Sequence, residues 1–179
     1  MNTAATTYDG INKYIRITDI DEDSHQIILS DIKSPLNNAD DSYLLKDGDI
    51  LFARTGASVG KTFIYTSDIG KAYFAGFLIC QRTKKEYNPR YIFQQTLTKS
   101  YLKFVKIYSQ RSGQPGINSN EYGQFVFSIP TTKREQDAIS FFLSHMDSLI
   151  AANERPDKNK HLWSCLPTEA HLRKNILTK

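Results

Sequence analysis

The sequence has few of the features that mark secreted, membrane or metal-dependent proteins. Only two cysteines occur among its 179 residues and no secretory leader opens it, so we expect a cytoplasmic protein with free thiols. No apolar run approaches the roughly 20 residues that a membrane-spanning helix needs, and no membrane partner is expected. The histidines are scattered without metal-ligand spacing, and we expect neither a metal ion nor another cofactor.

Two segments of the sequence partly match known functional motifs, a phosphate-binding loop and a nuclease metal site, but neither match is complete. Gly56-Ala-Ser-Val-Gly-Lys-Thr62 is similar to a phosphate-binding loop, but one residue too few separates its glycines. The residues that follow, 62–65, are β-branched and aromatic rather than helix-forming. The acidic residues of positions 19–23 gather carboxylates as nuclease metal sites do, but no Glu-x-Lys follows on a later strand. The nucleotide-binding and nuclease interpretations are therefore the less favoured ones.

Residues 46–62 combine a turn, a buried strand and a loop of small residues. Asp47-Gly48 is a turn signal, and the apolar run from Ile50 to Ala53 is typical of a strand buried on both faces. We predict a hairpin with strands over 49–54 and 59–66. Its small residues would let a ligand or another backbone approach closely, although an ordinary hairpin connection is the alternative. The side chains that offer donors around this loop are Arg54, Thr55, Ser58 and Lys61.

The rest of the first 130 residues indicates an α+β fold, mixed but mostly antiparallel, with one packed helix. Period-two alternation or short apolar runs predict strands over 14–20, 27–29, 72–81 and 125–129, with a loop at 34–38. Asn88-Pro89 is a helix start, and an apolar stripe at helical spacing predicts one helix running to about Ile107. The stripe consists of Phe93, Leu97, Tyr101, Phe104 and Tyr108.

Basic residues are concentrated in the middle of the chain, whose formal net charge is +4. Residues 82–111 carry eight basic side chains against the single acid Glu86, which suits nucleic acid and equally suits a helix with a solvated basic face. The polar loop 109–120 follows, and loops of this kind carry function when a rigid scaffold presents them. Guanidinium and carboxamide groups match the edges of guanine and adenine, so DNA contact competes here with an ordinary connecting loop. The candidates are Arg111, Ser112, Gln114 and Asn118.

A second helix is predicted after Pro130. Thr132-Lys-Arg-Glu135 is a capping box, and Pro156 ends the pattern. We therefore divide the chain into a domain over 1–130, a coiled-coil type helix over 131–155 and an irregular tail over 156–179. The helix has a seam that we expect to bind a partner helix or to support weak self-association. The seam consists of Ile139, Phe142, Met146 and Leu149.

Three stretches in this order resemble the specificity subunit of Type I restriction-modification systems. The first is Gly48-Asp-Ile-Leu-Phe-Ala-Arg-Thr-Gly-Ala-Ser-Val-Gly60 and the second is Gln114-Pro-Gly-Ile-Asn118. The third is Ile129-Pro130, leading into Glu135-Gln136 and a helix that ends Met146-Asp-Ser-Leu-Ile150.

The resemblance implies a non-catalytic target recognition domain that reads double-stranded DNA, followed by the start of a spacer helix. Such helices dock the methyltransferase (modification) subunits and, through them, the restriction subunit. No second recognition domain follows here and Pro156 interrupts the spacer, so we expect a half-subunit or a truncated subunit. The alternative is an assembly fragment that binds partner subunits through its helix without binding DNA alone.

Overall fold

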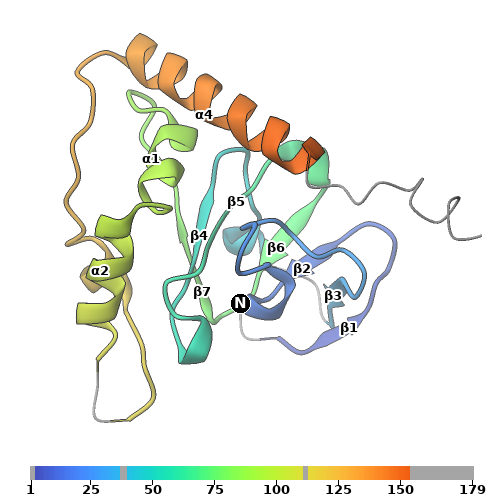
Figure 1. The fold of residues 1–179 in the computed structure, drawn as a ribbon. Helices are drawn as coiled ribbons and strands as arrows, with labels where there is room; N and C mark the ends of the chain where they lie inside the picture. Colours follow the sequence, from blue (N-terminus) through green and yellow to red (C-terminus); the bar gives the residue numbers. More distant parts are fainter. Residues whose placement is uncertain (1–2, 37–39, 111–112, 154–179) are drawn as a thin grey trace, which may run out of the picture. The chain divides into compact units, whose positions relative to one another are not determined.

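The computed structural model describes residues 3–36, 40–110 and 113–153 (Figure 1). The chain divides into two units, residues 1–142 and 143–179. The first unit contains two β-sheets and three helices, and the helix α4 (Lys133–Asn153) runs from the first unit into the second. The α+β fold class predicted from the sequence is confirmed.

The first sheet has four strands, in the order β1-β3-β2-β6. β3 pairs antiparallel with β1 and β2, whereas β2 and β6 are parallel. The strands are β1 (Ala5–Thr7), β2 (Lys13–Ile15), β3 (Lys33–Pro35) and β6 (Ala72–Phe74). β3 occupies part of the predicted loop 34–38, so that prediction was wrong, and residues 37–39 lie outside the described residues.

The strand predicted over 14–20 ends at Ile15 because a buried carboxylate draws the chain into a turn. Asp19 accepts hydrogen bonds from the backbone N of Arg16 at 2.8 Å and from its Nη2 at 2.6 Å. These bonds close the 3-10 turn Ile17–Asp19. The strand predicted over 27–29 is reduced to one bridge, between Ile20 and Ile27.

The second sheet has three antiparallel strands, in the order β5-β4-β7. They are β5 (Thr62–Ile64), β4 (Ile50–Ala53) and β7 (Leu78–Gln81). The hairpin predicted from residues 49–66 is therefore confirmed, with both strands shorter than predicted. The strand predicted over 72–81 is two strands in different sheets, because a turn closed by Leu78 N donating to Ala75 O (2.9 Å) redirects the chain.

Every residue of β4 is buried, as predicted, and its side chains alternate between two cores. Leu51 and Ala53 join a cluster shared with the first sheet, while Ile50 and Phe52 join a cluster shared with the helices. Figure 1 accordingly shows β4 between the four-stranded sheet and α1 and α2. A single strand thus organises the packing of both halves of the unit.

Asp49, immediately before β4, is fully buried and its charge is balanced. Its carboxylate accepts from Lys46 N at 2.8 Å and, in a bidentate pair, from Arg82 Nε at 2.8 Å and Nη2 at 2.6 Å. Bidentate guanidinium pairs are geometrically specific. The pair therefore fastens the start of β4 to the segment that follows β7.

The helices cover the face of the second sheet that points away from the first sheet, which we call its outer face. They are α1 (Pro89–Gln95), α2 (Lys99–Tyr108) and α3 (Ser119–Tyr122). Asn88 caps α1 as predicted, accepting from Arg90 N at 2.8 Å. The single helix predicted to Ile107 is broken, because the Thr96 hydroxyl donates to Phe93 O (2.7 Å) and Thr98 caps a new helix through Tyr101 N (3.3 Å).

The last strand predicted, 125–129, does not form, since this segment joins no ladder. It is held by side chains instead: Tyr91 donates to Ser128 O at 3.0 Å, and Gln136 Nε2 donates to Pro130 O at 2.9 Å. Thr132 accepts from Glu135 N at 3.3 Å at the start of α4, as the capping box predicted. The predicted tail over 156–179 lies outside the described residues, and within those described no helix is both long and apolar enough to cross a membrane.

Gly60 packs against α2 without room for a side chain. Its φ is +89°, and a Cβ there would lie 2.5 Å from Cγ1 of Val105 in α2. We expect Gly60→Ala to lower the free energy of unfolding by about 2–4 kcal/mol, from left-handed backbone strain and overpacking together. Chemical denaturation measures this.

Gly10→Ala is the matched control, since Gly10 has φ +87° and an added Cβ would meet nothing within 4 Å. It should cost only the backbone strain, about 1–2 kcal/mol. Equal losses in the two variants would contradict the steric role of Val105.

Candidate nucleic-acid interface

The two loops that carry the predicted DNA-binding residues meet at the end of β4. Gly56 N donates to Pro115 O at 2.9 Å, and Ile117 N donates to Arg54 O at 2.9 Å. Thr55 and Gly116 form an antiparallel bridge between these bonds. Residues 54–60 and 113–118, far apart in the sequence, therefore form one surface, which we call the joined loops.

Glycines permit this close approach. Gly56 has φ +73°, a backbone conformation that favours glycine, and Nε2 of Gln114 lies 3.3 Å from where its Cβ would be. A Cβ at Gly116 would lie 3.3 Å from Arg54 O. The carboxamide of Gln114 is thereby held over the hairpin loop rather than away from it.

Two buried tyrosines anchor the joined loops from beneath. Tyr122 donates to Ala53 O at 2.6 Å and accepts from Gly60 N at 3.0 Å, while Tyr101 donates to Gly60 O at 3.0 Å. Burial raises the pKa of Tyr122 to about 12 and raises the pKa of Tyr101 further still. Both hydroxyls therefore remain neutral donors across the physiological range.

Sequence reasoning did not assign a site role to either tyrosine. The apolar stripe predicts a packed ring at Tyr101, which is correct, and no pattern in the sequence singles out Tyr122. Their hydroxyl partners lie 41 and 69 residues away in the chain. No local pattern signals bonds between such distant residues.

The predicted residues of the hairpin loop have different environments. Arg54 is exposed, whereas Thr55 and Ser58 are half-buried. Lys61 is also half-buried, and its Nζ donates to Ile20 O at 3.0 Å. Arg54 is accordingly the cation of this loop with the greatest access to a ligand.

The predicted residues of the second loop, 113–118, also differ in their environments. Gln114 is exposed, but the side chain of Asn118 caps α3, accepting from Glu121 N at 3.0 Å. The Asn118 backbone N in turn donates to Glu121 Oε2 at 2.7 Å. The carboxamide oxygen of Asn118 is therefore already engaged. Arg111 and Ser112 lie outside the described residues.

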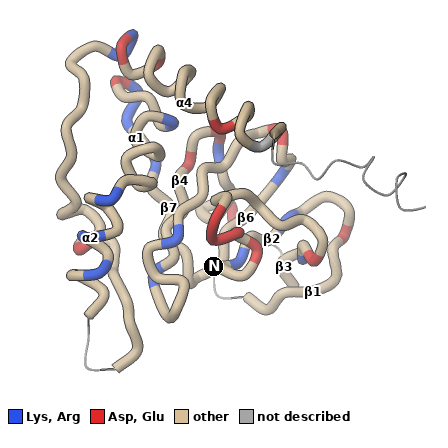
Figure 2. The backbone as a smooth tube through the Cα atoms, in the orientation of Figure 1, with Lys and Arg blue, Asp and Glu red and all other residues tan. Residues whose placement is uncertain are grey.

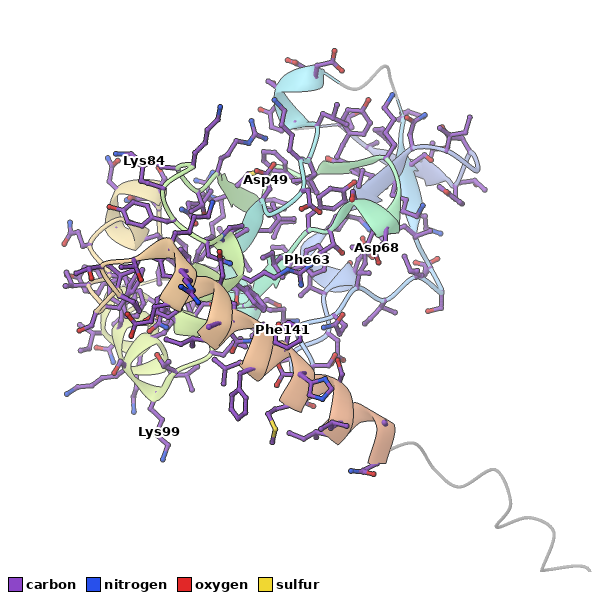
Figure 3. All side chains as sticks on the ribbon, turned by 90° about the horizontal axis from the view of Figure 1, so that it is seen from above. Asp49, Phe63, Asp68, Lys84, Lys99 and Phe141 are labelled. Carbon is purple, nitrogen blue, oxygen red and sulfur yellow. The ribbon has the colours of Figure 1, made fainter. Side chains whose placement is uncertain are left out.

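Positive charge lies along the solvent-exposed face of α2, the helix that packs against Gly60 of the hairpin loop through Val105. Lys99, Lys103 and Lys106 are exposed, and their spacing of four and three residues places them on one face of the helix. Blue positions follow α2 in Figure 2, and Lys99 points away from the domain in Figure 3. Between Glu86 and Glu121 the sequence has no acidic residue. A polyanion approaching this side meets no opposing carboxylate from that segment.

The seam residues predicted on α4 are largely exposed. Ile139 is half-buried, while Phe142 is 62% exposed, Met146 41% and Leu149 46%. Large apolar side chains on one helix face are typical of a surface that meets a partner. Elsewhere among the described residues, no cluster of three or more histidine, cysteine or acidic side chains is arranged to hold a metal ion.

The chain is similar to proteins of known family and structure. A family model described as the Type I restriction modification DNA specificity domain matches residues 1–162. A search of the curated proteins found no match. Among solved structures, the HsdS subunit from Thermoanaerobacter tengcongensis is 16% identical with a TM-score of 0.63, covering 86% of this chain and 38% of that one.

A second solved structure comes from work on complex assembly and conformational transition of the type I R-M system. It is 15% identical with a TM-score of 0.62, and the match covers 84% of this chain and 38% of that chain. At these identities the likeness shows the fold alone. The chain spans about two fifths of the length of the solved chains that it matches.

Tyr122→Phe tests whether the buried hydroxyl anchors the joined loops. Removing it withdraws the partner of Ala53 O and Gly60 N, so we expect a loss of about 1–3 kcal/mol in the free energy of unfolding and faster amide exchange at Gly60. Tyr108→Phe is the control, because its hydroxyl donates to the exposed Gln124 Oε1 and should matter by less than about 0.5 kcal/mol. Unchanged exchange at Gly60 would refute the anchor.

Proposed function

The chain belongs to the family of Type I restriction modification DNA specificity domains, and we propose that it reads its DNA sequence with the joined loops at the end of β4. Membership implies recognition of DNA sequence by a domain that is not itself catalytic. The observation that carries the proposal is the pair of backbone bonds between Gly56 and Pro115 and between Arg54 and Ile117. They bring Arg54, an exposed cation, and Gln114, an exposed carboxamide, into one surface.

The two kinds of contact divide between these side chains. Arg54 and the α2 lysines would bind phosphates, which positions the duplex without reading its sequence. Gln114 has the paired donor and acceptor that match adenine in the major groove. Thr55, Ser58 and Lys61 would support these interactions from the half-buried part of the loop, and Asn118 would do so through α3. Arg111 and Ser112, which lie outside the described residues, stay candidates for DNA contact from the sequence alone.

We further propose that the chain directs a methyltransferase subunit and, through it, a restriction subunit to the target. The description of the family and the exposed seam of α4 support this role. The seam also favours a second candidate function, in which the chain joins partner subunits through α4 and does not bind DNA alone. Salt-dependent binding of duplex DNA by the isolated chain separates the two.

Arg54→Gln tests the binding of phosphates. It should weaken binding to all duplexes alike, and the slope of log K against log salt should become shallower by about 0.9 for each phosphate that is no longer neutralised, because fewer counterions are released. Lys71→Gln is the control, since Lys71 is exposed beside β6 in the other sheet and should leave the slope unchanged. Identical slopes for wild type and Arg54→Gln would contradict the assignment.

Gln114→Ala completes the same experiment, since it removes no charge. It should leave the salt slope intact and change which sequences are selected from random duplexes, at about 1–3 kcal/mol for removal of a bidentate pair of hydrogen bonds to a base. A uniform loss of affinity across sequences would argue that Gln114 supports the loop and does not read bases.

The seam of α4 predicts weak self-association or binding to a methyltransferase subunit. Phe142→Asp combined with Leu149→Asp should abolish association measured by sedimentation, because it places charges in an apolar contact. Ser148→Asp adds a charge at an exposed position off the seam and should have little effect. A strict monomer at high concentration that also fails to bind the methyltransferase subunit would overturn the role of the seam.

A further inference from the structure

A half-open cavity of about 480 Å³ lies in the first unit, on the helical side of the three-stranded sheet. Its lining comes from β7 and the segment to Tyr87, from α1 and α2, and from α3 and the segment to Phe127. This volume falls within the roughly 300–1,000 Å³ of small-molecule sites. Neither the joined loops nor α4 contributes a residue to its lining.

Two polar groups of the cavity lining lack hydrogen-bond partners. Oε1 of Gln81 and Oγ1 of Thr83 are buried without one among the residues that the structure describes. Ile79, Gln81 and Thr83 occupy alternate positions, which in an extended chain places their side chains on the same face. An unpartnered buried polar group destabilises a fold. A small rotation of the Gln81 or Thr83 side chain would turn its oxygen toward the cavity, where a hydrogen bond to a ligand would offset that cost.

Several other polar groups around the cavity are engaged. The hydroxyls of Tyr101 and Tyr122 bond the hairpin loop, and Thr96 donates to Phe93 O at 2.7 Å. Arg82 pairs with Asp49. Gln81 and Thr83, by contrast, each have a buried oxygen with bonding capacity to spare.

The walls and the rim restrict the chemistry of the ligand. The rings of Tyr87, Phe125 and Phe127 contribute to the lining, and no acidic residue does. Lys84 is exposed at the rim and extends outward in Figure 3. The cavity thus suits a flat, aromatic ligand with a donor and acceptor edge and a negative charge.

We propose that this cavity binds a nucleobase that carries a 5′-phosphate. The base lies among the aromatic rings with its hydrogen-bonding edge toward Gln81 and Thr83, and the phosphate lies near Lys84. A carboxamide matches the donor and acceptor pattern of a base, and aromatic rings hold bases by stacking. The ligand is either a free nucleotide or an unpaired base of a bound DNA strand, and the second source rests on the proposed function.

Calorimetric titration of the full chain with each of the four deoxynucleoside monophosphates tests the site. We expect saturable binding that Gln81→Leu and Thr83→Val each weaken by about 3- to 10-fold, the range for removal of one hydrogen bond. The same two variants should melt at the wild-type temperature or above it, because each removes an unpartnered buried polar group. A purely structural role for these side chains would leave nucleotide binding unchanged.

Lys84→Gln and Lys85→Gln form a matched pair, since both lysines are exposed and only Lys84 lines the cavity. Lys84→Gln should weaken nucleotide binding and reduce its salt dependence, whereas Lys85→Gln should change neither. Binding of ribose 5-phosphate as tight as that of the nucleotides would overturn the assignment of a base site.

A second arm identifies the source of the base by comparing a matched duplex with one that contains a single unpaired base. A preference for the unpaired base that Gln81→Leu removes assigns the site to a DNA strand. Mononucleotide binding alone that responds to Gln81→Leu assigns it to free nucleotides. If neither responds to Gln81→Leu or Thr83→Val the proposal fails, whatever Arg54→Gln does to binding of matched duplexes.

Discussion

Burial of β4 on both faces constrains everything around it. A four-residue strand with no exposed side chain needs a complete layer on each side, and the chain supplies them from the four-stranded sheet and from the helices. Its start is closed by the buried Asp49 and the guanidinium of Arg82, which leaves no carboxylate uncompensated. The far end of the strand leads to the surface, and the joined loops are there.

The tyrosine hydroxyls extend this constraint to the surface. Tyr101 and Tyr122 contribute rings to the apolar cluster against the outer face of the sheet, while their hydroxyls hold the backbone of Ala53 and Gly60. Gly60 in turn has no room for a side chain beneath Val105. The packing of the helices and the placement of the loops therefore depend on each other. A change in either should alter the other through the contacts of Tyr101, Tyr122 and Gly60.

The parts of the fold predicted from the sequence are those with local causes. The apolar run before Arg54 indicated a doubly buried strand, and Asn88-Pro89 and Thr132 indicated helix starts, because turn and capping chemistry acts within a few residues. The predictions that were wrong concern segments whose structure is determined by hydrogen bonds to distant residues or by side chains that compete with the regular backbone pattern. Asp19 ended a strand by bonding Arg16, threonines broke the helix near Thr96, and the alternation at 125–129 had no neighbouring strand to pair with. The meeting of the two loops, which defines the site, depends on backbone bonds that no residue pattern encodes.

The backbone ties between the two loops bear on how such a domain changes its target over generations. Gly56 and Ile117 donate from the main chain to main-chain oxygens, so these two bonds do not depend on the side chains at exposed positions such as Arg54 and Gln114. Replacements at those positions alter the chemistry offered to the outside while the scaffold is retained. Loop length does not have this freedom, because an insertion in one loop would break its register with the other. Drift in preference by point substitution is therefore easier than drift by insertion or deletion.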